Sequence, residues 1–312
     1  MNSTNHKTSH TQLGKRVWRD RYLYIMIVPT IVWFLVFCYL PMGGLVIAFQ
    51  NYRIGMGMFG NGEWVGLTNF KKLFADDYFQ RAFFNTLIIS FYRIIVCLPG
   101  AVILSVMLTE VRHKIYKSVV QTLTYIPYFL SWIIVASFAI TLLNPDLGIN
   151  LLLKNAGMKP IMLTDESMFR GIVVFTDLWK DVGFNSIVFM AVIVQIDQAQ
   201  YESADIDGAS RLQKIWFITL PALKSTILVV MVLWIGSIIN VGFDQVFNLY
   251  NPVVYSVGDI IDTYIYRISF AGGSNKFSLA AAAGLFKSVI CMVLLLGAEL
   301  IAKSLGESAV FE

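Results

Sequence analysis

The chain has 312 residues, of which 57% are hydrophobic and 14% are charged, and its formal net charge is +4. The mean hydropathy is +0.66, and the hydrophobic fraction exceeds the roughly 45–50% that is usual in soluble globular domains. This composition excludes an ordinary soluble protein and predicts an integral membrane protein that contacts lipid and binds no nucleic acid.

Six stretches are long and apolar enough to cross a bilayer, because a spanning helix needs about 20 largely apolar residues. They cover residues 22–49, 84–110, 119–143, 172–195, 223–243 and 279–302. We therefore expect an all-α, polytopic membrane protein with six transmembrane helices in a single domain, residues 22–303. Residues 1–21 would form a retained polar tail, because no small-residue cleavage pattern follows the first span, and residues 304–312 would form a second tail.

The basic residues predict the orientation. If the N-terminus is cytoplasmic, twelve of the 24 Lys and Arg residues fall in the shorter inner segments and nine in the longer outer loops. Cytoplasmic segments are enriched in Lys and Arg, so we expect both termini to be cytoplasmic. In the first outer loop, residues 69–87 alternate apolar and polar residues at helical spacing, and we expect them to form an interfacial helix that leads into span two.

Span two and span four contain ionisable residues. Arg93 is a single cation in span two, while Asp177, Lys180 and Asp181 lie in the outer part of span four. Such groups are costly at membrane depth and usually pair or face a wet cavity. Spacing would allow Lys180 to neutralise Asp177, whereas Arg93 could pair across the bundle or contact an acidic substrate.

Span four also carries candidate residues for a substrate path. The indole of Trp179 would suit the apolar face of a sugar ring, and Asp181 and Asn185 would supply polar groups on a neighbouring face. The alternative interpretation is a neutral pair of charges at the membrane surface, without a role in transport.

The cytoplasmic loop of residues 196–222 follows span four. Its first half is acidic: Asp197, Glu202, Asp205 and Asp207 have no Lys or Arg among them. Gly208 suits the left-handed position just after a helix, and Ser210 with Gln213 matches a capping box that begins a second helix. Pro221 suits the first turn of span five. The loop is therefore predicted to be two short helices joined at Gly208.

Span five ends in four polar residues, Asn240, Asp244, Gln245 and Asn248. Three of them recur every four residues and share one approximate helix face. They would either line a path for a carbohydrate or form hydrogen bonds between helices. Span six contains one further single cation, Lys287, for which the sequence indicates no partner.

The 196–222 loop resembles the signature of the membrane subunits of binding-protein-dependent ABC importers, which reads E-A-A, D-G-A and then I-x-L-P. The matching residues are Glu202, Ser203, Ala204, Asp207, Gly208, Ala209, Ile218, Leu220 and Pro221. Ser203 departs from the alanine that is usual in the family. Other segments, such as YIPYFLSW (125–132) and LWKDVGFNSIVFM (178–190), are similar to permeases for oligosaccharides and polysaccharide fragments.

This resemblance implies a type I ABC importer permease in a bacterial cytoplasmic membrane. Such a subunit pairs with a second homologous permease, two ATP-binding subunits and an extracellular solute-binding protein, and it forms half of the path for an oligosaccharide. By the same resemblance, residues 200–209 are the coupling helix, which contacts the ATPase through Glu202 to Gly208. ATP and Mg²⁺ would be held by the partner ATPase.

The sequence contains no phosphate-binding G-x-x-x-x-G-K-[ST] motif. Its three histidines, His6, His10 and His113, have no metal-site spacing. We therefore expect no enzyme activity, no metal site and no cofactor in this chain. The alternatives are a permease for peptides or amino acids, an independent secondary transporter, and a membrane-embedded glycan-handling enzyme.

Overall fold

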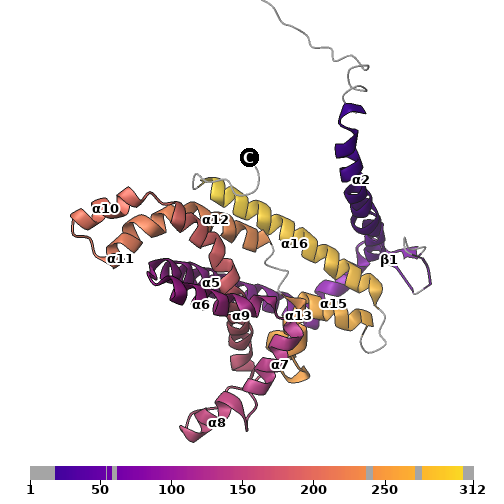
Figure 1. Cartoon of the computed structure of the whole chain (residues 1–312). Helices are drawn as coiled ribbons and strands as arrows, with labels where there is room; N and C mark the ends of the chain where they lie inside the picture. The colour runs from indigo at the N-terminus through magenta and orange to yellow at the C-terminus, as the bar shows by residue number, and fades with distance from the viewer. Residues whose placement is uncertain (1–17, 54, 58–61, 237–241, 271–275, 305–312) are drawn as a thin grey trace, which may run out of the picture.

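The structure is a computed structural model of the chain, and it describes residues 18–53, 55–57, 62–236, 242–270 and 276–304. Within these ranges the fold is helical apart from one two-stranded antiparallel sheet, formed by β1 (Gln50–Asn51) and β2 (Glu63–Trp64). The predicted all-α fold is therefore confirmed (Figure 1).

The α-helices follow one another along the chain with few long connections. They are α2 (Arg21–Phe34), α3 (Leu40–Met42), α4 (Thr68–Phe74), α5 (Asp77–Glu110), α6 (Lys114–Tyr125), α7 (Trp132–Leu142), α8 (Gly148–Asn155), α9 (Glu166–Gln195), α10 (Gln198–Ile206), α11 (Arg211–Lys214), α12 (Leu220–Gly236), α13 (Phe243–Leu249), α14 (Tyr255–Gly258), α15 (Ile261–Phe270) and α16 (Phe277–Ser304). Two π-helical segments are η1 (Leu35–Tyr39) and η4 (Ile215–Thr219). The 3₁₀ segments are η2 (Gly43–Phe49), η3 (Ile126–Phe129) and η5 (Pro252–Val254).

Four continuous helical stretches are long and apolar enough to cross a membrane. They are Arg21–Phe49, Asp77–Glu110, Arg211–Gly236 and Phe277–Ser304. Two bent pairs bring the number to six if each pair is one span: α6 and η3 with α7, bent by 105°, and α9 with α10, bent by 68°. The described residues thus hold four to six candidate spans, which agrees with a multi-pass membrane protein.

The predicted third span, residues 119–143, is not one straight helix. η3 contains Pro127, which has no amide hydrogen to donate, and Leu130 after it is extended. Ser131 then caps α7 by accepting a hydrogen bond from the Ile134 amide at 3.4 Å. The chain therefore ends one helix and starts another within a few residues, which produces the 105° bend.

The expected interfacial helix over residues 69–87 is also divided. α4 ends at Phe74 and α5 begins at Asp77, because the carboxylate of Asp76 accepts a hydrogen bond from the Tyr78 amide and caps the new helix. Leu73 of α4 and Phe79 of α5 are buried against Tyr264 and the start of α16. The segment is part of the packed bundle at that point.

α5 and α9 form the central helix pair, and they pack along much of their length. Their buried apolar residues include Ile89 from α5 and Val173 from α9, which share one cluster with Val246 of α13. α16 packs against α12, α15, α4 and η2 on another side. Figure 1 shows α10 and α11, which belong to the 196–222 loop, on one side of the bundle, and α7 and α8 projecting from another.

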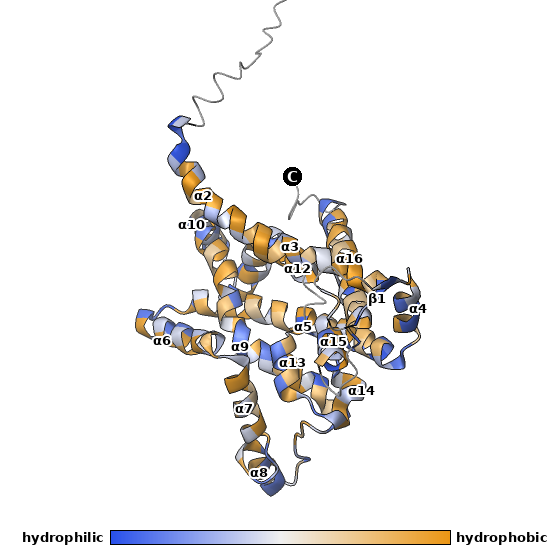
Figure 2. Cartoon of the chain, turned by 90° about the vertical axis from the view of Figure 1, so that its right-hand side faces the viewer, coloured by the Kyte–Doolittle hydropathy of each residue, from blue (hydrophilic) through white to orange (hydrophobic). Residues whose placement is uncertain are grey.

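α2 stands away from the bundle. None of its residues is buried, and large side chains such as Trp33 and Phe37 of the α2–η2 stretch remain exposed. Figure 2 shows this helix as a predominantly hydrophobic ribbon outside the packed core. An apolar helix of this length needs lipid or another protein around it, because apolar surface in water is unfavourable.

Candidate functional site

The first part of the candidate site is α10, which lies across the end of α9. The carboxylate of Asp197 caps it by accepting a hydrogen bond from the Ala199 amide at 3.0 Å. No residue of α10 is buried, and Glu202 and Ser203 are exposed. The helix therefore presents the acidic half of the signature as a projecting surface, at the far left of Figure 1.

The turn after α10 has the predicted geometry. Gly208 adopts φ +76°, the left-handed region that favours glycine. Its amide donates to the Asp205 carbonyl at 3.1 Å, and the Ala209 amide donates to the Ala204 carbonyl at 2.8 Å. These two bonds make a Schellman motif. The D-G-A part of the signature thus has a local structural role, which is to end α10 and reverse the chain.

α11 begins as predicted but does not end before Pro221. Ser210 and Gln213 form both hydrogen bonds of the capping box. The helix then continues through η4 into α12, so residues 211–236 form one stretch. In η4 the Leu220 amide donates to the Ile215 carbonyl, five residues back. Pro221 lies in the first turn of α12, as the sequence predicts, but the apolar stretch begins ten residues earlier, because this π-helical turn lets the helix pass a residue that lacks an amide hydrogen.

Two side-chain contacts tie α10 to this long helix. The hydroxyl of Tyr201 hydrogen-bonds that of Thr219 at 2.9 Å, and Thr219 is buried. Lys214 donates to Asp205 at 2.6 Å. The expectation that the acidic residues lack a cationic partner is thereby corrected: Lys214 lies one helix later in the chain but folds back onto α10.

The I-x-L-P residues lie where η4 continues into α12. Ile218 is half-buried and Pro221 is exposed. Leu220 packs on a cluster that includes Leu98 of α5 and Leu223 of α12. The exposed helix α10 is therefore connected to the core of the bundle by a short, continuous helical segment.

Of the residues of span four that are predicted to line a substrate path, Trp179 borders a cavity. Trp179 stacks on Phe138 of α7 with ring centroids 6.0 Å apart. Both rings line an apolar cavity of about 640 Å³ between α7, α8 and α9. Asp181 lies 3.8 Å from Lys180. Asn185 is half-buried, about three helical turns after Phe175, which lines the same cavity. Trp179 is thus the predicted path residue that the structure places at a cavity.

The span-five residues are separated by the structure. Asn240 lies outside the described residues, while Asp244, Gln245 and Asn248 belong to the short helix α13. Asp244 is exposed, and Asn248 donates to its backbone carbonyl at 2.7 Å. Gln245 is fully buried, and its amide donates to Val173 and Thr176 of α9. Gln245 therefore joins α13 to α9.

The ionisable residues of the spans pair differently from the prediction based on spacing. Arg93 of α5 donates to Asp177 of α9, with Nε 2.8 Å from Oδ2. Lys180 instead donates to the Tyr128 carbonyl at 2.6 Å, at the end of η3. Lys287 pairs with Asp262 of α15 at 2.6 Å. The cations whose partners the sequence did not indicate are thus neutralised by contacts between helices.

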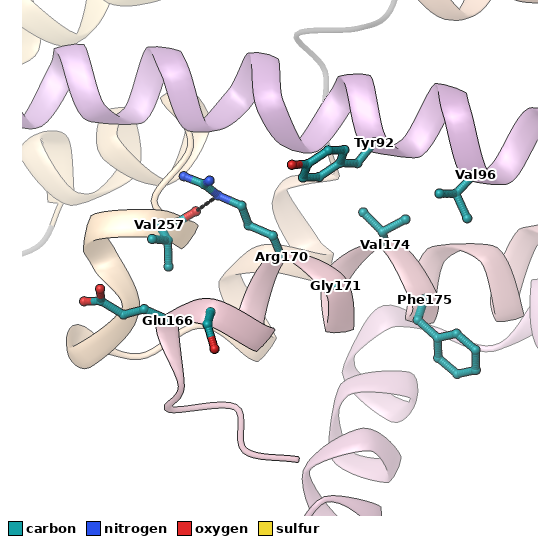
Figure 3. A pocket seen from close by; sticks show the side chains of 9 residues that line it. Tyr92, Val96, Glu166, Arg170, Gly171, Val174, Phe175 and Val257 are labelled. Carbon is teal, nitrogen blue, oxygen red and sulfur yellow. Dashed lines mark hydrogen bonds between the residues drawn. The ribbon is translucent and has the colours of Figure 1, made fainter. Parts of the chain in front are cut away.

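A second cavity, of about 810 Å³, lies beside the start of α9 (Figure 3). Arg170 points into it, with Nε donating to the Val257 carbonyl at 3.1 Å and Nη2 to Asn85 Oδ1 at 2.7 Å. Tyr92 of α5 lies beside it, and the carboxylate of Glu166 accepts a hydrogen bond from Ser256 at 2.7 Å. Arg170 makes no ion pair within the described ranges.

In the sequence, Arg170 is one of nine cations in the outer loops, and nothing in its neighbourhood distinguishes it from the others. The only available signal is its position one helical heptad before Asp177, on the same helix. At the helix start, hydrogen bonds from Lys159 and Ser167 lower the pKa of Asp165 to about 2, so this capping carboxylate stays charged even in mild acid. The end of α9 that borders this cavity is therefore firmly capped.

The described parts of the chain hold no cluster of side chains suited to a metal ion. No group of three or more His, Cys, Asp or Glu residues there has a geometry that could hold a metal ion. The three cysteines, Cys38, Cys97 and Cys291, are free.

The chain matches a known family of membrane transport proteins and is similar to two curated proteins. The family described as "Binding-protein-dependent transport system inner membrane component" matches residues 97–307. The chain is 40% identical to protein LplB of Bacillus subtilis (strain 168) over 295 residues, which is 94% of this chain and 92% of that protein. It is 38% identical to the polygalacturonan/rhamnogalacturonan transport system permease protein YteP of the same organism over 307 residues, covering 98% and 95% of the two chains.

Two crystal structures are also similar. One is a bacterial ABC transporter involved in the import of the acidic polysaccharide alginate, with a TM-score of 0.86 and 40% identity over 94% of this chain and 99% of that chain. The other is a bacterial alginate ABC transporter in complex with an alginate pentasaccharide-bound periplasmic protein, with a TM-score of 0.86 and 39% identity over 96% and 100% of the chains.

Proposed function

Because the chain belongs to the family of binding-protein-dependent transport system inner membrane components, we propose that it forms half of the path by which an ATP-driven importer moves an acidic oligosaccharide. The chain is a permease subunit of an ABC importer and not an enzyme, since in such importers ATP is hydrolysed by separate subunits. It is a multi-pass membrane protein with several apolar helices.

The proposed substrate rests on sequence similarity. The chain is nearly 40% identical to two transport proteins along almost their whole length. One is named for polygalacturonan and rhamnogalacturonan, and the other imports the acidic polysaccharide alginate. Acidic sugars carry carboxylates, which form strong, often bidentate hydrogen bonds with arginine. An acidic oligosaccharide therefore fits the names of both relatives.

The geometry near the start of α9 supports this substrate class. The guanidinium of Arg170 is held by neutral acceptors, Asn85 and the Val257 carbonyl, so no ion pair within the described residues neutralises its positive charge beside the cavity. Trp179 borders the neighbouring cavity and offers an aromatic face. We assign sugar contact to these residues and, as the sequence predicts, to Asp181, Asn185, Asp244 and Asn248, together with Asn240, which lies outside the described residues. Gln245 is fully buried and would support this path indirectly, by holding α13 against α9.

We assign coupling to the α10–α11 unit. Glu202, Ser203, Ala204, Asp207, Gly208 and Ala209 would contact an ATP-binding subunit, and Ile218, Leu220 and Pro221 would pass its movement to α12. Two contacts support this assignment. The outer surface of α10 is exposed, but the Tyr201–Thr219 and Asp205–Lys214 contacts hold α10 to η4 and α11. A unit held at two points moves as one body more readily than a free loop.

The full importer would contain a second homologous permease, two ATP-binding subunits and an extracellular solute-binding protein. The exposed apolar surface of α2 supports contact with lipid or with another membrane subunit. We place both termini and α10 in the cytoplasm, with α8 and α14 outside. ATP and Mg²⁺ would be held by the partner subunits.

The test is uptake by the complete importer, assembled with its partner subunits and binding protein in lipid vesicles. With ATP, it should accumulate a uronate oligosaccharide and not a neutral oligosaccharide of equal length. Arg170→Gln should lower uptake of the acidic sugar roughly tenfold, the loss typical of one charged hydrogen bond. Lys154→Gln removes an exposed cation on α8 and serves as the matched control.

A second arm tests coupling. Glu202→Lys should abolish co-purification of the ATP-binding subunits, whereas Glu63→Lys, at an exposed glutamate of β2, should leave it intact. Preference for the neutral sugar would overturn the substrate assignment alone. Uptake without ATP, or binding of the ATP-binding subunits that is insensitive to Glu202→Lys, would contradict the coupling assignment.

A further inference from the structure

A polar cavity of about 440 Å³ lies beneath α10, on the side that faces the bundle. Its walls come from the end of α5, the start of α6, the end of α9 and the α10–η4 segment. α6 and α10 lie on the same side of the molecule in both overall views (Figures 1 and 2). The cavity is separate from the exposed surface of α10 to which we assign coupling.

The lining of this cavity is positively charged. Its ionisable residues are four cations and two carboxylates: Arg112, Lys117, Arg211, Lys214, Glu110 and Asp205. Lys214 and Asp205 neutralise each other at 2.6 Å. This leaves three cations facing one carboxylate in the same cavity.

The three remaining cations make no ion pair or side-chain hydrogen bond within the residues that the structure describes. They come from three different segments: Arg112 from the turn after α5, Lys117 from α6 and Arg211 from α11. Arg112 and Arg211 are exposed and Lys117 is half-buried, so water screens part of the repulsion between these like charges, and an anion between them would remove the rest. Convergence of this kind is typical of sites that bind phosphate groups.

The apolar part of the lining indicates where the anion would come from. Val106, Ile193 and Val194 line the same cavity, and Val194 is 74% exposed at the end of α9. The cavity therefore borders both the apolar surface of the spans and the polar 196–222 loop. Phospholipid headgroups lie where hydrocarbon gives way to water, so a boundary between apolar spans and a polar loop would meet them.

We propose that this cavity is a binding site for a phosphate group, supplied by the headgroup of an anionic phospholipid. Arg112, Lys117 and Arg211 would contact the phosphate, while the acyl chains would follow Val194 and the outside of the spans. Tyr201, Asp205 and Lys214, which fix α10 to the long helix, line the same cavity. The bound phosphate would therefore stabilise the position of α10.

The proposal is tested on the assembled complex, purified in detergent and titrated with lipid, with bound lipid counted by native mass spectrometry. Phosphatidylglycerol should bind and phosphatidylcholine should not. Lys117→Gln combined with Arg211→Gln should weaken phosphatidylglycerol binding roughly tenfold or more, since charged hydrogen bonds are lost. Lys114→Gln combined with Lys224→Gln removes two exposed cations of α6 and α12 that do not line the cavity, and it should change binding little.

A second double variant distinguishes loss of charge from a folding defect. Lys117→Arg combined with Arg211→Lys keeps both charges and should retain the lipid. A parallel titration with inorganic phosphate and glycerol 3-phosphate distinguishes the sources: binding of these with the same sensitivity to the variants, but none of the lipid, would assign the site to a soluble phosphate. Absence of all binding, equal loss in the Lys114/Lys224 control, or displacement of the lipid when the ATP-binding subunits assemble would overturn the proposal.

Discussion

The pairing of Arg93 with Asp177 shows how one residue contact joins the two central helices. The residues are 84 positions apart, and the side chain of Asp177 is only 4% exposed. A buried carboxylate that loses its partner stays desolvated without compensation, so removal of one partner is more damaging than removal of both. The pair should therefore behave as a single unit in mutational tests.

We predict that Arg93→Met destabilises the subunit by about 3 kcal/mol, in the range found when one partner of a buried pair is removed. The double variant Arg93→Met with Asp177→Leu should recover much of this loss. The measurement is thermal unfolding of the purified complex in detergent, analysed as a double-mutant cycle. Additive effects of the two single variants would show that the pair does not form.

Other residues of the site have purely local explanations. Gly208 takes the left-handed conformation, and Ser210 with Gln213 forms the capping box. These are short-range effects of backbone sterics and of hydrogen bonds across three residues, so they could be predicted from the sequence. Lys214 could not be assigned to Asp205 in this way, because their contact needs the chain to reverse at Gly208 first.

At the scale of elements, α10 is joined to the η4–α12 helix by few side-chain contacts. Tyr201 and Thr219 supply one of them, across 18 positions of the chain. Under the proposed function, this contact transmits movement from the ATP-binding subunit to α12. Its loss should weaken the link between ATP hydrolysis and transport without unfolding the subunit.

We predict that Tyr201→Phe raises the number of ATP molecules hydrolysed per sugar imported, because the removed hydroxyl forms a hydrogen bond worth about 1 kcal/mol. Simultaneous measurement of ATP hydrolysis and uptake in vesicles gives this ratio. Tyr116→Phe, at an exposed tyrosine of α6, is the control and should leave it unchanged. An unaltered ratio in Tyr201→Phe would mean that the Asp205–Lys214 contact alone suffices.

The breaks in the helices show what periodicity does not predict. Span three is bent at Pro127–Ser131. Its first part packs against α9, where Gly183 has no room for a side chain because an added Cβ would clash with the Thr124 carbonyl. Span five instead continues past Pro221 through a π-helical turn. Two prolines in apolar stretches thus have opposite outcomes: the chain becomes extended at Leu130 after Pro127, whereas a π-helical turn precedes Pro221 and the helix continues.

At the scale of the whole molecule, the orientation in the membrane remains a proposal based on the distribution of basic residues. A cysteine-free variant with single cysteines at exposed positions tests it. We expect Lys154→Cys of α8 to react with a membrane-impermeant maleimide added outside intact cells. Lys114→Cys of α6 should react only after the cells are opened, because the two positions lie at opposite ends of the bundle.

Labelling of Lys114→Cys in intact cells, with protection of Lys154→Cys, would show the reverse orientation. A lipid-exposed control such as Met107→Cys, on the apolar surface of α5, should resist the reagent in both preparations. The result also tests the location of the proposed phosphate site, because the start of α6 forms one of its walls.

The sequence by itself determined the membrane class, the positions of the apolar stretches and the local structure of the 196–222 signature. These depend on composition and on contacts within a few residues, so they are present before the chain folds. The tertiary structure alone decided the partners of Arg93, Lys180 and Lys287, the bend of span three and the cavities beside Arg170 and beneath α10. Each of these needs helices from distant parts of the chain to meet, and helix periodicity shows which face of a helix is apolar but not which neighbour it packs against.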